Sequence, residues 1–113
     1  MEIDYYQFQD LLGQKNLILA AIGAPNCPYS RRMYRLCRQI ARQYAPPLTV
    51  VTLKESAASA IAAAQGLELL PALVLYCRGR ALGTLFLPDS LSAVDRFLHY
   101  TLSGSVYEKE ILL

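Results

Sequence analysis

A cysteine, Cys27, lies where an apolar run gives way to a strongly patterned helix, in the sequence Cys27-Pro28-Tyr29-Ser30. The unpaired N–H groups and the dipole at a helix N-terminus favour negative charge, so they lower the pKa of a thiol placed there. Ser30 could donate a hydrogen bond to the resulting thiolate or cap the helix. Arg31 and Arg32 follow within one turn and also favour the thiolate. The sequence therefore predicts nucleophilic sulfur chemistry at Cys27, with Ser30 in place of a second thiol.

The other two cysteines do not supply that second thiol. Cys37 lies ten residues along the same predicted helix, which is about 15 Å at 1.5 Å per residue, whereas a disulfide needs Cα atoms within about 7 Å. Cys37 also falls on the apolar stripe of that helix, so we interpret it as a small buried hydrophobe. Cys77 ends a predicted strand and is interpreted as structural. A mixed disulfide at Cys27 would need an external thiol, such as glutathione, to release it.

A row of basic residues follows Cys27. Arg31, Arg35, Arg38 and Arg42 are spaced i, i+4, i+7 and i+11, and no acid lies between residues 31 and 42. Like charges at this spacing repel weakly, and cations near a helix N-terminus are mildly unfavourable. This local cost predicts an anionic partner, such as an acidic protein surface. The alternative is a solvated face with acids supplied by neighbouring elements.

Hydrophobic periodicity and turn residues predict the elements that position these side chains. Pro46 and Pro47 stop the long helix, and Arg78-Gly79-Arg80 predicts a tight turn between two antiparallel strands. The strand–helix alternation before that turn predicts parallel pairing. In order we expect a helix over 5–12, a strand over 17–22, a helix from the Cys27 turn to about 44, a strand over 48–53, a helix over 56–65, strands over 73–76 and 81–86, and a helix capped by Asp89 or Ser90 and ending at 102.

Composition indicates one globular domain over residues 1–113, with a core at about 5–102 and a tail at 103–113. The chain has 113 residues, of which 54% are hydrophobic and 18% charged. Its net charge of +2 is too small to indicate nucleic acid or a membrane as partner. The acidic start lacks the basic region of a signal peptide, and the longest apolar run is too short to span a bilayer, so we expect a cytoplasmic protein. Ile111, Leu112 and Leu113 of the tail could dock on this domain or on another chain.

The element order, Cys27 at the strand-to-helix junction and Leu70-Pro71 before an apolar strand together resemble the thioredoxin fold over residues 5–102. From Cys27 to 44, and at 48–50 and 71–79, the sequence aligns with thioredoxins without a gap. The resemblance implies an α/β fold with a four-stranded mixed sheet, a parallel pair plus an antiparallel hairpin, flanked by helices. It also implies a cis Pro71 facing Cys27, with the Leu70 and Pro71 backbone able to pair with a bound peptide or glutathione. Without the resemblance, Pro71 would be interpreted as a rigid turn.

The active-site turn resembles the glutaredoxin C-P-Y-C with its last cysteine replaced by Ser30. The thioredoxin Trp position is Asn26, the buried acid of thioredoxins falls at Ala21, and the glutaredoxin Lys before the cysteine is Ala24. These differences imply a single-cysteine, monothiol mechanism. In glutaredoxin-like sites the aromatic ring of Tyr29 would stack over a ligand; the alternative is an ordinary exposed loop residue.

Two classes of function follow. In the first, the chain is a thiol–disulfide oxidoreductase or isomerase of monothiol type. Cys27 and Ser30 carry the chemistry, and Pro28, Tyr29, Leu70 and Pro71 contact a protein disulfide or glutathione. Cys27 with glutathione could also hold an iron–sulfur cluster, as monothiol glutaredoxins do. In the second, the chain is a redox-inactive adaptor that uses the same face and the four arginines. His99 has no second ligand in the sequence, so no metal site is assigned.

Overall fold

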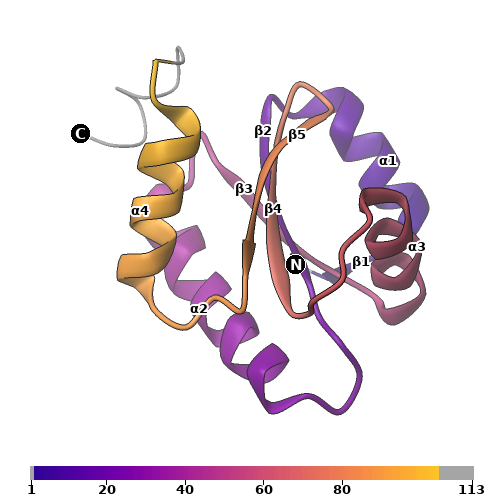
Figure 1. Cartoon of the computed structure of the whole chain (residues 1–113). Helices are drawn as coiled ribbons and strands as arrows, with labels where there is room; N and C mark the ends of the chain where they lie inside the picture. Colours follow the sequence, from indigo (N-terminus) through magenta and orange to yellow (C-terminus); the bar gives the residue numbers. More distant parts are fainter. Residues whose placement is uncertain (1, 105–113) are drawn as a thin grey trace.

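Five strands form one sheet, and two helices cover each of its faces (Figure 1). The computed structural model describes residues 2–104. The elements are β1 (Glu2–Ile3), α1 (Tyr5–Gln14), β2 (Leu17–Ile22), α2 (Pro28–Tyr44), β3 (Thr49–Leu53), α3 (Glu55–Gln65), β4 (Ala72–Cys77), β5 (Arg80–Phe86) and α4 (Leu91–Leu102).

The strand order is β1-β3-β2-β4-β5, with β1, β3 and β2 parallel and both β4 and β5 antiparallel to their neighbours. The α/β class, the parallel pair and the antiparallel hairpin are confirmed. The prediction of four strands was wrong, because β1 adds a fifth at the edge of the sheet. A strand of two residues carries no detectable period, and β1 is defined only by its pairing with Thr52 and Leu53.

The central strand β2 is buried on both faces, which explains its continuous apolar sequence. Leu17, Leu19 and Ala21 pack on one side with α2 and α4. The alternate residues Ile18, Ala20 and Ile22 pack on the other side with α1 and α3. Successive side chains of a strand point to opposite faces, so this one strand contributes to both cores.

Most predicted boundaries lie within two residues of the observed ones. The first helix continues through Gly13 to Gln14, and α3 begins at Glu55 after Lys54 as N-cap. Ser90, one of the two predicted caps of the last helix, accepts a hydrogen bond from the Ala93 N–H. Within residues 2–104 no helix is both long and apolar enough to cross a bilayer. The tail residues Ile111 to Leu113 lie outside the described residues.

Candidate active site

The Cys27 loop and the Leu70–Pro71 turn lie at the same end of the two central strands, β2 and β4. Ile22, the last residue of β2, pairs with Ala72, the first residue of β4. The loop of residues 23–27 continues from β2 into α2, and Pro71 immediately precedes β4, both at the lower end of the sheet in Figure 1. The Leu70–Pro71 peptide bond is cis. Pairing at the centre of the sheet thus brings together two segments that are more than forty residues apart in sequence.

Two close contacts hold the Cys27 loop in place. A Cβ on Gly23 would lie 2.1 Å from the Tyr34 hydroxyl oxygen, so this position requires glycine while Tyr34 keeps its place. The Ser30 hydroxyl accepts a hydrogen bond of 2.8 Å from the Ala24 N–H. Ser30 is only 2% exposed. Its side chain therefore bonds the loop rather than capping α2, whose N-cap residue is Cys27.

Cys27 is partly exposed and starts α2 with extended backbone angles. The pKa of its thiol is lowered, chiefly by the Ser30 backbone N–H and then by the Ser30 hydroxyl, the Tyr29 N–H and the Arg31 charge; desolvation opposes them. The thiol itself makes no capping hydrogen bond. These donors at the start of α2 favour the thiolate over the thiol.

Pro28 and Tyr29 lie on the outer surface of the first turn of α2. Both are exposed, and the Tyr29 ring is 58% exposed. The Arg32 guanidinium lies 5.8 Å from the centre of that ring, within the range of a cation–π contact. The ring is thus available to a bound molecule on the side away from Arg32.

The Leu70–Pro71 turn offers fewer backbone groups than the sequence suggested. The Pro71 carbonyl already accepts a hydrogen bond of 2.9 Å from the Leu87 N–H. Proline has no N–H of its own to donate. Pro71 is buried, whereas Leu70 is half-buried, and the Leu70 backbone has no hydrogen-bond partner among residues 2–104. Pairing with an extended peptide would therefore fall mainly to Leu70.

A cleft of about 260 Å³ opens beside Cys27 on the side of β3 and α3. Glu2, Tyr34 and Glu55 contribute polar groups to it, and Leu53 and Ala58 contribute apolar surface. No local pattern in the sequence marks these residues. The parallel pairing of β2 with β3 was the available signal, because it places the chain after β3 beside the chain after β2.

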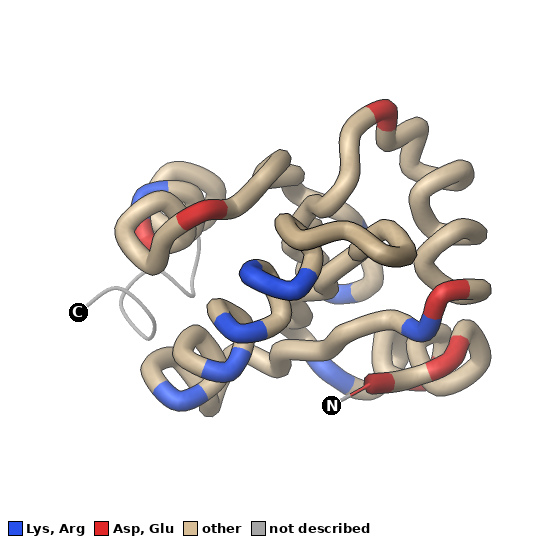
Figure 2. The backbone as a smooth tube through the Cα atoms, turned by 90° about the horizontal axis from the view of Figure 1, so that it is seen from below, with Lys and Arg blue, Asp and Glu red and all other residues tan. Residues whose placement is uncertain are grey.

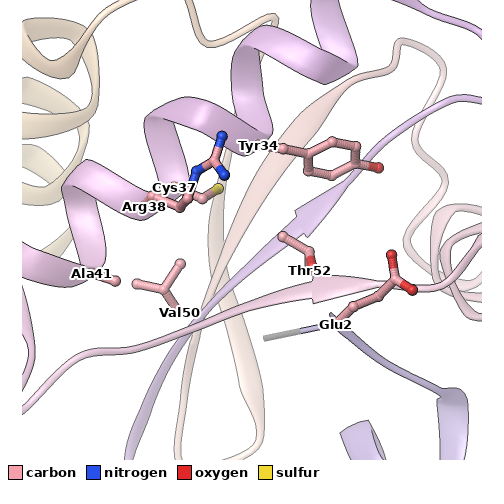
Figure 3. A pocket seen from close by; sticks show the side chains of 7 residues that line it. All are labelled: Glu2, Tyr34, Cys37, Arg38, Ala41, Val50 and Thr52. Atoms are coloured by element: carbon pink, nitrogen blue, oxygen red, sulfur yellow. The ribbon is translucent and has the colours of Figure 1, made fainter.

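A second hollow of about 350 Å³ continues from Glu2 and Tyr34 along α2 (Figure 3). Cys37, Arg38 and Ala41 of α2 face Val50 and Thr52 of β3 across it. The Cys37 side chain belongs to the core and is 4% exposed, which confirms its interpretation as a buried hydrophobe. Burial raises the pKa of the Cys37 thiol to about 12, so it is a poor nucleophile at neutral pH.

The four predicted arginines, which we call the arginine row (Arg31, Arg35, Arg38 and Arg42), are all exposed. Figure 2 shows the basic positions of α2 in blue, spread along the helix. None of them forms an ion pair with an acid in the described part of the chain; the ion-pair contact found there joins His99 and Asp95 at 3.8 Å. Acids of neighbouring elements do lie near the row without pairing with it: Glu2 and Glu55 line a cleft with Arg31, and Asp89 lines a hollow with Arg35.

The remaining candidates lie elsewhere. Cys77 pairs with Leu17 at the opposite end of the sheet from Cys27, and all three cysteines are free. No group of three or more His, Cys, Asp or Glu residues in the described ranges could hold a metal ion. An iron–sulfur cluster on Cys27 would thus need its other ligands from elsewhere.

Comparison with known proteins identifies the fold through structure alone. No protein-family model matches the sequence, and no curated protein is similar to it. The structure is similar to thioredoxin from Plasmodium falciparum, with a TM-score of 0.75 and 15% identity over 88% of this chain and 96% of that one. A variant thioredoxin from Entamoeba histolytica matches with a TM-score of 0.71 and 20% identity, over 88% of this chain and 97% of that one. A variant thioredoxin from Halobacterium salinarum matches with a TM-score of 0.71 and 21% identity, over 88% of this chain and 90% of that one. The chain has the thioredoxin fold, as its sequence resemblance predicted.

Proposed function

We propose that this chain exchanges thiols and disulfides through the single nucleophile Cys27. The observation that carries the proposal is the position of this thiol: partly exposed, at the N-cap of α2, with a lowered pKa. A thiolate attacks disulfides, whereas a protonated thiol does not. The buried Cys37 and the distant Cys77 leave no internal thiol to resolve the product.

The reaction has two stages. First, the Cys27 sulfur attacks one sulfur of a substrate disulfide; a new S–S bond forms, the substrate S–S bond breaks, and the departing thiolate takes a proton from water. Next, a low-molecular-weight thiol, with glutathione as the leading candidate, attacks the Cys27 sulfur and releases the substrate thiol. A second molecule of that thiol frees Cys27. Two external thiols are thus oxidised to a disulfide, and the substrate gains two electrons and two protons.

The surrounding residues have distinct roles in this proposal. Ser30 is a positioning residue: it bonds the Ala24 N–H and favours the thiolate through its amide and hydroxyl. Pro28 and the exposed Tyr29 ring contact the substrate on one side of Cys27. Leu70, whose backbone N–H and carbonyl have no partner within residues 2–104, aligns the substrate chain on the other, beside Pro71.

Alkylation and mixed-disulfide formation test the proposal. Iodoacetamide should modify Cys27 with a midpoint below the thiol pKa of about 8.5 of an unperturbed cysteine. Oxidised glutathione should form a mixed disulfide that disappears in Cys27→Ser but persists in Cys77→Ser. In Ser30→Cys the new thiol should resolve that adduct, because residues i and i+3 are neighbours on a helix. An ordinary alkylation midpoint, or a glutathione adduct that survives Cys27→Ser, would contradict the proposal.

The arginine row, which makes no ion pair in the part of the chain that the structure describes, favours a second candidate, a redox-inactive adaptor that binds an acidic protein. In that case Cys27 would form no mixed disulfide with a substrate, and partner binding would be unchanged in Cys27→Ser but lost in Arg35→Glu. The proposed exchange function predicts a mixed disulfide at Cys27, so the reaction with oxidised glutathione separates the two.

A further inference from the structure

The arginine row and the Cys27 cleft belong to one continuous surface. Arg31 lines the cleft together with Cys27, and it also lines a shallow hollow of about 350 Å³ with Tyr34, Arg35 and Arg38. From Arg31 to Arg42 the helix advances about 16 Å at 1.5 Å per residue. An extended chain of about five residues covers that length. A substrate cysteine bound at Cys27 therefore places its neighbouring residues within reach of the row.

No direct ion pair neutralises the positive charges on this surface within residues 2–104. α2 contains no acid, and no arginine of the row makes an ion pair within residues 2–104. Asp89 lines a hollow with Arg32 and Arg35 but stays beyond ion-pair distance. Guanidinium groups bind carboxylates through paired, charge-assisted hydrogen bonds. The row thus presents exposed donors that match the carboxylates of a partner.

The opposite wall of the cleft has the opposite charge. Glu2 and Glu55 line it on the side of β1 and α3, facing Arg31. An acidic segment would be repelled from that wall and attracted to α2. The charge distribution therefore fixes the side of Cys27 on which such a segment lies.

We propose that the arginine row docks an acidic peptide segment flanking the disulfide cysteine of the substrate, so that acidic substrates react preferentially at Cys27. This inference rests on the exchange function proposed above and specifies its substrate class. Charge steering of this kind raises association rates by about 10- to 1,000-fold and weakens as salt rises. The Debye length falls from about 30 Å at 0.01 M to about 3 Å at 1 M ionic strength.

The test compares three peptides of equal length, each with a central cysteine linked by a disulfide to neutral 2-thiopyridine. The cysteine is flanked on both sides by Asp, Asn or Lys residues. Release of 2-thiopyridone reports attack by Cys27. We expect the Asp peptide to react at least about tenfold faster than the Asn peptide at low ionic strength, with the Lys peptide slowest. The difference should vanish near 1 M salt.

Two double variants of equal net charge test whether the preference for the Asp peptide depends on the arginine row. In Arg35→Glu/Arg38→Glu the ratio of the Asp to the Asn rate should fall to one or below. In Arg78→Glu/Arg80→Glu it should keep its wild-type value, because that hairpin turn lies at the opposite end of the sheet. Arg35→Gln/Arg38→Gln, which adds no acid, should lower the ratio in the same direction if the charge-reversed protein fails to fold.

The outcomes separate the two proposals. Equal rates for the Asp and Asn peptides, both lost in Cys27→Ser, would overturn the acidic preference and leave the exchange function standing. Equal loss of the preference in both charge-reversed variants would show that net charge, not the arginine row, is responsible. Failure of every peptide to react at Cys27 would overturn both proposals.

Discussion

The Ser30 hydroxyl has two tasks, and two measurements on one variant distinguish them. It accepts the Ala24 N–H at 2.8 Å and also favours the Cys27 thiolate. In Ser30→Ala we expect the thiol pKa of Cys27 to rise, though not to its ordinary value, because the Ser30 backbone N–H makes the larger contribution and remains. The Ala24 N–H loses its partner, which costs about 1–3 kcal/mol of stability when such a group is buried.

Alkylation of Cys27 over a pH series measures the first effect, and urea unfolding measures the second. Ser59→Ala, an exposed position of α3, is the matched control and should change neither quantity. An unchanged alkylation midpoint in Ser30→Ala would show that the hydroxyl does not act on the sulfur.

For single residues, the sequence predicted those properties that depend only on neighbouring residues in the chain. The N-cap position of Cys27 and the burial of Cys37 both follow from helical periodicity within one segment. Glu2 and Glu55 could not be found in that way. They reach the Cys27 cleft only through the pairing of β1 with β3 and of β3 with β2, and no local pattern marks an acid for that position.

Among the elements, the Cys27 loop lies close against α2 at Gly23. A Cβ added to Gly23 would meet the Tyr34 hydroxyl oxygen at 2.1 Å and the Ser30 Cβ at 3.2 Å. We therefore expect Gly23→Ala to destabilise the protein by about 1–3 kcal/mol, as overpacking of a filled site does. Removal of the hydroxyl in Tyr34→Phe should recover part of that loss.

A double-mutant cycle measures this coupling by urea unfolding of the two single variants and the double variant. The matched control is Gly13→Ala on α1, where an added Cβ meets nothing within 4 Å. If the effects of Gly23→Ala and Tyr34→Phe simply add, the loop is free to move away from α2, and the close contact does not fix the position of Cys27.

The long helices and strands could be predicted because each has an apolar face of several residues. Helix α2 repeats its buried positions at Met33, Leu36, Cys37, Ile40 and Tyr44, so its type and length were clear. The short β1 has only two residues, and its strand character depends on β3. A strand that is defined only by its pairing partner cannot be predicted from hydrophobic periodicity. For this reason the sequence predicted four strands, whereas the structure has five.

For the whole molecule, the sheet topology follows from general rules on how consecutive strands and helices connect. The Cys27 cleft, in contrast, depends on the relative positions of several segments. Alternating strands and helices predicted the parallel pair, and the Gly79 turn predicted the hairpin. The cleft beside Cys27 combines β1, the 23–27 loop, α2, the end of β3 and α3. Its shape requires the position of each segment at once, so the sequence could identify its nucleophile but not its walls.

Burial of weak acids makes the stability of the whole fold sensitive to alkaline pH. Burial raises the pKa of Cys37 to about 12 and also raises the pKa values of Tyr34, Tyr44 and Tyr76. The hydrogen bond from the Tyr44 hydroxyl to Asp95 acts in the same direction. The folded state thus holds these protons more tightly than the unfolded chain. The stability they contribute is fully present below the unfolded pKa, which is about 8.5 for a cysteine and about 10 for a tyrosine, and is lost as pH rises through the higher folded pKa.

We therefore expect the free energy of unfolding to fall steadily above about pH 9. In Cys37→Ala the fall between pH 9 and 12 should be shallower, since one pKa unit corresponds to about 1.4 kcal/mol. Urea unfolding across that range, in the presence of a non-thiol reductant, measures both slopes. Ser59→Ala, which removes no titratable group, should keep the wild-type slope. Identical slopes in wild type and Cys37→Ala would mean that Cys37 loses its proton as readily in the folded protein as in the unfolded chain, which is incompatible with its burial between α2 and the sheet.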